Sequence, residues 1–138
     1  MTDSVVTGTT SGIGLATVVR LAKAGHKVYA GIRNPSTADD LKAAIEQTGG
    51  TIAMLKLDVT DEGSIQDAIA SVLAAEGRID VLVNNAGISS RGSVEETSLE
   101  VFRGIFETNF FGLVAVTQAV LPGMRERSSG AIINVGSL

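Results

Sequence analysis

The chain has 138 residues, of which 44% are hydrophobic and 19% charged, with a formal net charge of −4 and no cysteine. This length suits one domain that can bury a sizeable core, and the composition excludes a disordered chain. The negative charge argues against a nucleic-acid partner, the absence of cysteine excludes disulfides and thiolate metal sites, and no stretch reads as long and apolar enough to cross a membrane.

Apolar runs typical of buried strands alternate along the chain with apolar residues at helical spacing. We predict five strands, which cover residues 4–7, 27–32, 51–57, 79–83 and 131–135. The first three are followed by helices over residues 11–24, 37–48 and 61–75, with Thr60 as the cap of the third. A longer helix begins at Thr97 or Ser98 and extends to residue 119 or as far as 127, with a kink or break at Pro122 and Gly123.

This alternation predicts an α/β protein with a Rossmann-type, doubly wound parallel sheet. Right-handed crossovers between the strands give the strand order 3-2-1-4-5. Ligands of such sheets bind outside the carboxyl ends of the strands, where the strand order reverses between strands 1 and 4. Functional residues are therefore expected directly after each predicted strand.

The stretch that follows the first strand reads Thr7-Gly8-Thr9-Thr10-Ser11-Gly12-Ile13-Gly14. Gly8 can turn the chain off the strand end, and Gly12 leaves no side chain where a pyrophosphate must approach the backbone. Gly14 lets the next helix pack closely on the sheet, and the N–H groups at the helix start can bind phosphates. The spacing differs from the general Gly-x-Gly-x-x-Gly fingerprint, and three glycines can also form an ordinary turn. The candidate cofactor-binding residues in this stretch are Gly8, Thr10, Ser11, Gly12, Ile13 and Gly14.

Four further motifs follow in order along the chain. Asp58-Val59 follows the third strand, and Asn84-Asn85-Ala86-Gly87 lies at the end of the fourth. Asn109 lies within the long helix, and Ser137 follows the fifth strand. Together with the glycine-rich stretch, these motifs resemble those of the short-chain dehydrogenase/reductase (SDR) family, and the resemblance covers the whole chain. It implies an NAD(P)-dependent oxidoreductase that acts on a small-molecule carbonyl or alcohol.

The resemblance implies cofactor-binding roles that each have a simpler alternative. Asp58 would accept a hydrogen bond from the adenine amine, or would be a polar strand-end residue near the cap at Thr60. Val59 would pack on or beside the adenine ring. The cofactor cleft would also be lined by Asn85, Ala86 and Gly87, which can equally form a turn because Asn and Gly favour turns.

The resemblance implies catalytic roles for two residues. Asn109 would hold a water in a proton relay, whereas the simpler alternative is a buried amide with satisfied hydrogen bonds. Ser137 would bind the substrate carbonyl or hydroxyl and stabilise developing charge, or it would belong to an ordinary turn. Asn84 is expected to tie neighbouring strands together, and we expect His26 to be solvated and to have no role. No His, Asp or Glu cluster has metal-ligand spacing, so we expect no metal site.

The chain departs from the family in one respect. Members carry a Tyr-x-x-x-Lys pair beyond the catalytic serine, whereas the single tyrosine here, Tyr29, falls in the second strand. We therefore expect residues 1–138 to form an incomplete NAD(P)-binding Rossmann domain. It would be the N-terminal part of such an enzyme, without the family's C-terminal strands and helices, and inactive alone.

The residues after the second strand predict a preference for NADP (NADPH), with NAD possible. NAD binding needs an acid there to accept from the ribose 2′-hydroxyl, but no Asp or Glu occurs between Leu15 and Ala38. Ile32 occupies the expected place, and Arg33 follows it. Arg33 can pair with a 2′-phosphate, or it can be a solvated loop cation.

The leading prediction is thus an NADP-dependent oxidoreductase. The alternatives are a dinucleotide-binding or sensing module without turnover, and a structural piece that binds nothing. We expect a cytoplasmic protein without nucleic-acid or membrane partners, and a homo-oligomer formed through the helix around residues 98–120. That helix carries Phe102, Phe106 and Phe110 at i, i+4, i+8 spacing, a stripe that is also typical of a core.

Overall fold

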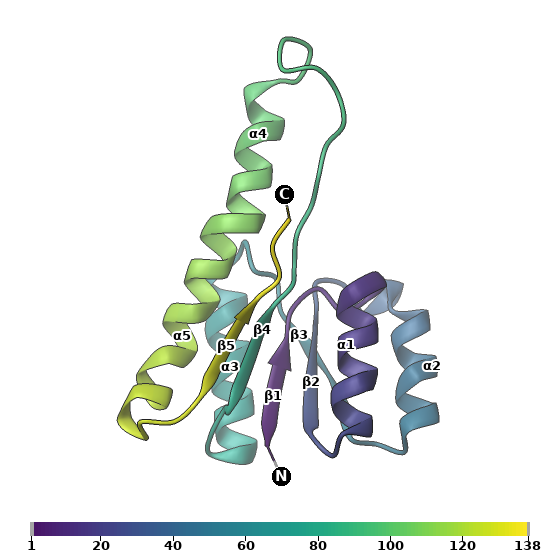
Figure 1. Cartoon of the computed structure of the whole chain (residues 1–138), viewed down its shortest axis with the longest axis vertical. Coiled ribbons are helices and arrows are strands. Elements are labelled where there is room, and N and C mark those ends of the chain that lie inside the picture. The colour runs from purple at the N-terminus through teal and green to yellow at the C-terminus, as the bar shows by residue number, and fades with distance from the viewer. Residues whose placement is uncertain (1, 138) are drawn as a thin grey trace.

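A computed structural model describes residues 2–137 of the chain. Five parallel strands form one sheet in the order β3-β2-β1-β4-β5 (Figure 1), which confirms the predicted Rossmann-type fold. The register pairs Val5 with Tyr29 on one side and with Leu82 on the other, so β1 lies at the centre of the sheet. The strands are β1 (Asp3–Val6), β2 (Lys27–Ile32), β3 (Ile52–Lys56), β4 (Val81–Asn84) and β5 (Ala131–Asn134).

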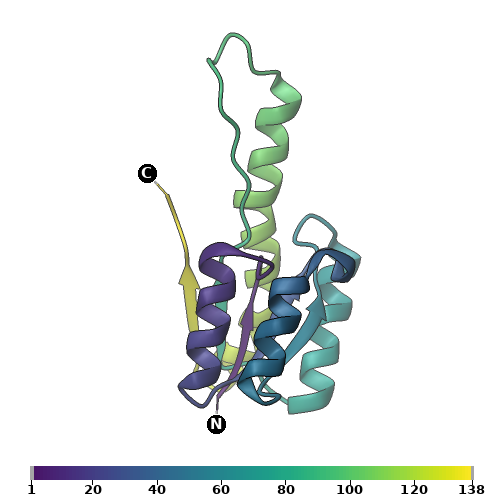
Figure 2. The same ribbon diagram turned by 90° about the vertical axis from the view of Figure 1, so that its right-hand side faces the viewer.

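Helices cover both faces of this sheet (Figures 1 and 2). One face carries α1 (Gly12–Lys23) and α2 (Asp39–Thr48), and the other carries α3 (Glu62–Glu76) and α5 (Leu113–Glu126). Successive strand residues point to opposite faces, so Val6 joins the core under α1 and α2 while Val5 joins the core under α3 and α5. Burial on both faces explains why the strands read as continuous apolar runs rather than as alternating patterns.

The long helix differs from its prediction at Pro122 and Gly123. It begins as α4 (Leu99–Phe106), passes through a π-helical segment η2 (Glu107–Gly112) and continues as α5 through Pro122 to Glu126. Of the kink or break expected at Pro122 and Gly123, the break is therefore wrong. Val120 and Met124 are both buried on either side of it, and this packing on the sheet offsets the hydrogen bond that proline removes.

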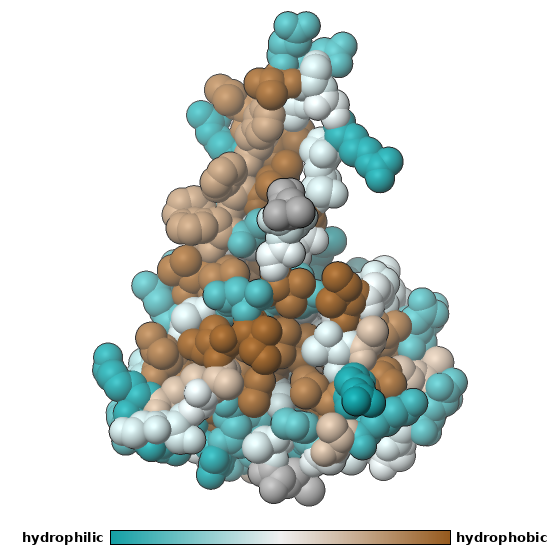
Figure 3. Space-filling model, in the orientation of Figure 1, coloured by the Kyte–Doolittle hydropathy of each residue, from teal (hydrophilic) through white to brown (hydrophobic). Residues whose placement is uncertain are grey.

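The expectation that no stretch is long and apolar enough to cross a membrane is wrong as a statement about length and composition. Within the described residues, the continuous helical segment Leu99–Glu126 has 28 residues and a mean hydropathy of 1.3 in its most apolar window, which suffices by length and composition alone. Its α5 half packs on the sheet, whereas α4 extends beyond the sheet beside the chain that follows β4 (Figure 1). Apolar side chains are exposed along the extended half (Figure 3), and Phe106 is 60% exposed.

Two helix starts also differ from their predictions, and both lie near the candidate site. The helix expected over residues 37–48 is a short 3-10 turn η1 (Pro35–Thr37) followed by α2, and Asn34 accepts a hydrogen bond from the Ser36 N–H at the start of that turn. The cap of α3 is Asp61 rather than Thr60, because the Asp61 carboxylate accepts from the Ser64 N–H. The Thr60 hydroxyl instead donates to the carboxylate of Asp58.

Candidate cofactor-binding site

A cavity of about 440 Å³ lies at the carboxyl ends of the strands, where the predicted switch point occurs. Its lining comes mainly from four separate stretches of the chain, namely those that follow β1, β2, β3 and β4. The predicted cofactor-binding residues that line it are Gly8, Thr10, Ser11, Arg33, Asp58, Val59, Asn85, Ala86 and Gly87. The remaining three, Gly12, Ile13 and Gly14, belong to the same turn but do not line the cavity.

The glycine turn has the backbone geometry that its sequence indicates. Gly8 has a φ of +67°, and a Cβ there would lie 2.7 Å from the Cα of Ala86. Gly12 has a φ of +56°, and no described atom lies within 4 Å of where its Cβ would be, so this backbone is open. A Cβ on Gly14 would lie 2.1 Å from the carbonyl oxygen of Gly8. A Cβ there would also lie 2.5 Å from Asn85 Nδ2, so Gly14 allows a close approach both to the turn and to the residue that follows β4.

Thr7 is the first residue of the glycine-rich stretch, but it is not among the predicted site residues. Its hydroxyl is buried and accepts hydrogen bonds from the Asn85 and Ala86 N–H groups at 3.0 and 2.9 Å. In return, Asn85 Nδ2 donates to the carbonyl oxygens of Thr7 and Gly8 at 3.1 and 2.9 Å. On the other side, the Thr9 hydroxyl donates to Gly31 O at 3.1 Å. These bonds join the turn to the ends of β4 and β2. In the sequence, the only indication of them is that polar side chains occur in a stretch at the end of a strand.

Arg33 and Asp58 lie in the part of the cavity formed by the ends of β2 and β3. Burial alone would raise the pKa of Asp58, but hydrogen bonds from Thr60 and the charge of Arg33 lower it below its usual value. Asp58 Oδ1 accepts from the Thr60 hydroxyl and N–H at 2.7 and 2.9 Å. These bonds fit the alternative in which Asp58 is a polar strand-end residue near Thr60. Ile32 is 1% exposed, so the position expected to carry an acid in an NAD site is an apolar core residue.

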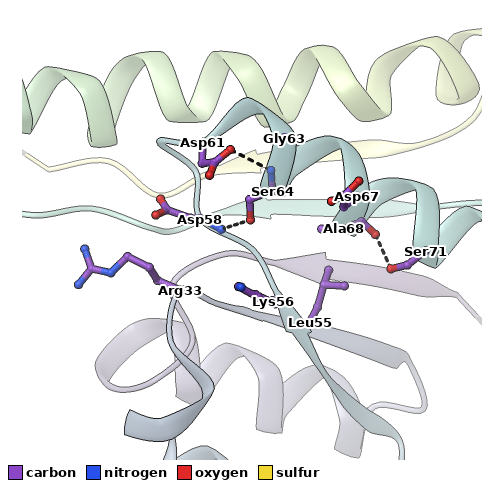
Figure 4. A pocket seen from close by; sticks show the side chains of 10 residues that line it. All are labelled: Arg33, Leu55, Lys56, Asp58, Asp61, Gly63, Ser64, Asp67, Ala68 and Ser71. Carbon is purple, nitrogen blue, oxygen red and sulfur yellow. Dashed lines mark hydrogen bonds between the residues drawn. The ribbon is translucent and has the colours of Figure 1, made fainter.

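A second, larger cleft of about 700 Å³ adjoins the first beyond Asp58 (Figure 4). Arg33 and Lys56 line it from one side. Asp61, the residue before α3, and Asp67 of α3 line it as well. It contains no residue of the glycine turn or of the stretch after β4. The smaller cavity is therefore the candidate dinucleotide site, since only it combines the glycine turn with Arg33.

Asn109 lies in the π-helical segment and is exposed, so the alternative of a buried core amide is wrong. Its Oδ1 accepts from the Ile88 N–H, and its Nδ2 donates to the Ile88 carbonyl, each at 2.8 Å. The neighbouring Thr108 and Ile88 both line the cavity. The side-chain amide is thus bound to the backbone of the chain that follows β4.

Ser137 lies on the exposed chain that follows β5 and does not line the cavity. Tyr29 is remote from the site as predicted, because its hydroxyl donates to Glu76 at the end of α3. His26 is half-buried rather than solvated and contacts the hydroxyls of Thr2 and Ser4. Within residues 2–137, no group of three His, Asp or Glu side chains is arranged to hold a metal ion.

Comparisons with known proteins agree with this geometry. The sequence profile of the short chain dehydrogenase family matches residues 4–138. The chain is 40% identical to human dehydrogenase/reductase SDR family member 7 over an alignment of 144 positions, which covers 100% of the chain and 42% of that protein. It is 42% identical to a short-chain dehydrogenase from Streptomyces avermitilis whose crystal structure is known, with a TM-score of 0.89 over 99% of the chain and 49% of that structure.

A third match carries a bound dinucleotide. The crystal structure of a gluconate 5-dehydrogenase from Burkholderia cenocepacia, in complex with NADP and tartrate, is 32% identical, with a TM-score of 0.88 over 99% of the chain and 53% of that structure. The chain thus spans about half the length of the relatives it matches. Since the family profile matches nearly every residue, the chain belongs to the short-chain dehydrogenase family.

Proposed function

We propose that the chain provides the cofactor-binding part of an NADP-dependent oxidoreductase that interconverts a small-molecule carbonyl and an alcohol. The observation that carries the proposal is the composition of one cavity. Its lining includes the glycine turn and Arg33, and the strand that precedes Arg33 ends in buried Ile32 instead of an acid. When bound there, the dinucleotide would supply the hydride, and the protein would supply position and proton transfer.

Several residues of the chain have properties that fit this function. The open backbone at Gly12 and the N–H groups at the start of α1 can bind the pyrophosphate. Arg33 can form charge-assisted hydrogen bonds to a 2′-phosphate, which an acid at this place would repel. On the substrate side, the Ser137 hydroxyl is exposed at the carboxyl edge of the sheet and can donate to a substrate oxygen.

The alternative is a protein that binds the dinucleotide without turnover. It is favoured by one observation: among residues 2–137, neither the only tyrosine nor the only histidine reaches the cavity, so the general acid must come from elsewhere. A longer protein with the family's Tyr-x-x-x-Lys pair would be an enzyme, and one without it would be a sensor.

The experiment is a titration of the chain with NADPH and NADH, followed by intrinsic or cofactor fluorescence. We expect NADPH to bind at least 10-fold more tightly, and Arg33→Ala to remove most of that difference because it deletes one charge-assisted contact. Lys56→Ala is the matched control, since this cation lines only the adjoining cleft. Equal affinities for the two dinucleotides in the unaltered chain would refute the NADP preference, and no binding of either would refute the site.

A further inference from the structure

The pair Asn84-Asn85 at the end of β4 stands between the cofactor turn and the chain that bears Ser137. Asn84 is the last residue of β4 and Asn85 lies just beyond it, and their side chains bond to different neighbours. Asn85 bonds to the carbonyls of Thr7 and Gly8, which belong to the cofactor turn. Asn84 makes its bonds on the other side, and the function proposed above gives it no role.

The Asn84 amide joins three elements at one point. Its Nδ2 donates to the Thr117 hydroxyl of α5 and to Asn134 Oδ1 of β5, both at 3.0 Å. The residue is 4% exposed, so its amide depends on these two Nδ2 bonds, because Oδ1 is buried without a hydrogen-bond partner among the described residues. Thr117 lies on the helix that continues from the π-helical segment, so the same amide is linked to the helix that carries Asn109.

The connection to Ser137 is short. Asn134 is paired with Asn84 in the sheet, and the Val135 N–H donates to the Asn84 carbonyl at 2.9 Å. Beyond Val135 the chain leaves the sheet, and Gly136 and Ser137 are exposed. Among the described residues, the bonds to Asn84 are therefore the last hydrogen bonds that fix the direction of the chain before Ser137.

We propose that Asn84 is a positioning residue that sets the relative placement of Ser137 and the helix bearing Asn109, while Asn85 separately holds the cofactor turn. This inference rests on the proposed oxidoreductase function, because it assigns Ser137 to the substrate. The two adjacent amides then have different roles, since Asn84 acts on the substrate side of the site and Asn85 on the cofactor side. A small displacement of a reacting group lowers rates strongly without any change in binding elsewhere.

The test measures cofactor affinity and turnover separately in the full-length protein. Asn84→Leu keeps the volume and removes the donors, and Asn134→Ala removes the acceptor at an exposed position with little risk to folding. We expect each to lower kcat/KM for a carbonyl substrate by about 10- to 100-fold and to leave the NADPH dissociation constant within about 2-fold. The double variant should equal the more severe single one, since both remove the same link.

Two further variants serve as controls in this experiment. Gln118→Ala, at an exposed position beside Thr117, should leave both quantities unchanged, whereas Asn85→Ala should weaken NADPH binding. Amide hydrogen exchange of Val135, whose N–H donates to the Asn84 carbonyl, should become faster in Asn84→Leu in the 138-residue chain, and this readout does not depend on turnover. A full-length protein that is inactive with every carbonyl, but shows this faster exchange, would refute the oxidoreductase and support the positioning. An active protein in which Asn84→Leu changes kcat/KM and cofactor affinity equally, or changes neither, would overturn the inference.

Discussion

Asn109 binds both polar backbone groups of Ile88, with its Oδ1 and Nδ2 each 2.8 Å from their partners. The two residues are 21 positions apart, and the bonds join the π-helical segment to the start of the chain that follows β4. A π turn places residues differently from an α turn and is frequent at functional sites. Here it directs the Asn109 side chain at the backbone of Ile88, a residue that lines the cavity, so Asn109 fixes this part of the cavity wall.

We expect Asn109→Ala to loosen that wall with little effect on global stability. Both groups of Ile88 that lose their partners are at an exposed position and can bond to water, so the free energy of unfolding should fall by no more than about 1 kcal/mol. The Ile88 amide should exchange with solvent markedly faster. Asn34→Ala, which removes a comparable exposed side-chain bond to Ser36, is the control and should not alter Ile88 exchange. Unchanged exchange at Ile88 in Asn109→Ala would contradict the assigned bond.

The glycine turn should tolerate no side chain at Gly14. A methyl group there would lie 2.1 Å from Gly8 O, and because that neighbour is backbone, Gly14→Ala should destabilise the chain by about 1–3 kcal/mol or more. Gly104 provides a matched control in α4, where no atom would lie within 4 Å of an added Cβ. Gly104→Ala should stabilise by about 0.5–1 kcal/mol because alanine is the better helix former. Thermal or urea unfolding distinguishes the two, and equal effects would show that the close contact is absent.

The amino-terminal edge of the sheet should make stability depend on acid pH through Asp80. Burial would raise the pKa of this carboxylate, but hydrogen bonds from the Asp3 N–H and from Arg78 lower it below its usual value. A lowered folded-state pKa stabilises the fold above the unfolded value of about 4, and this stabilisation is lost as the pH falls through the folded-state pKa.

Asp80→Asn should therefore cost about 1–3 kcal/mol at pH 7 and progressively less below pH 4. Urea unfolding of the variant and the unaltered chain between pH 2.5 and 7 measures this difference. Asp39→Asn is the control, because this carboxylate is exposed and forms one weak ion pair with Lys42 at 3.6 Å. A difference for Asp80→Asn that stays constant over the whole range would contradict the assignment.

Exposed phenylalanines should cause the chain to self-associate. Of the predicted stripe, Phe106 and Phe110 are 60% and 54% exposed and Phe102 is half-buried, so the stripe is not core in the described chain, and the neighbouring Phe111 is also 54% exposed. Burying each ring against another copy would contribute about 1.5–3 kcal/mol. Phe106→Ser with Phe110→Ser should weaken association by at least 10-fold in sedimentation velocity, while Glu126→Ser on the same helix should not. A chain that remains monomeric at high concentration would contradict this expectation.

The 138-residue chain should not reduce a ketone at a measurable rate. Ser137 and Asn109 can orient groups, but neither is a proton donor near neutral pH, and a positioned acid contributes roughly 10²–10⁴-fold. NADPH oxidation with a panel of carbonyl substrates, monitored at the nicotinamide absorbance, tests this. Turnover by the purified chain, free of contaminating reductase, would show that the catalytic roles are assigned wrongly.

The sequence predicted the sheet well, because strands buried on both faces are continuous apolar runs and glycines mark their ends. The sequence-based prediction failed where a local backbone preference and the burial of side chains favour different structures. Pro122 disfavours a helix, but the burial of Val120 and Met124 outweighs it, and only packing reveals that balance. The π-helical segment was also invisible, since its residues differ in hydrogen-bond pattern and not in composition.

In the candidate site, nine of the twelve cofactor-binding residues predicted from the sequence line the cavity, but the sequence did not indicate their hydrogen-bond partners. The motifs at Gly8, Asp58 and Asn85 were found because each follows a strand, and the parallel topology gathers strand ends at one edge. The hydroxyl of Thr7 was missed because its partners are 78 and 79 residues away along the chain. Partners this distant become neighbours only through the pairing of β1 with β4.

The π-helical segment also determines how this helix can change in length over evolution. A π turn closes its hydrogen bond over one more residue than an α turn, so this segment absorbs one additional residue while α4 and α5 stay in phase. Deleting one residue between Glu107 and Gly112 would let a regular α-helix form with the face of α4 nearly unchanged, but the turn that directs Asn109 at Ile88 would be lost. A one-residue change within α5, which has no wide turn to absorb it, would instead rotate α4 by about 100° relative to the face that packs on the sheet. Changes in length should therefore be tolerated in the π-helical segment and in the loop that precedes α4, and be rare within α5.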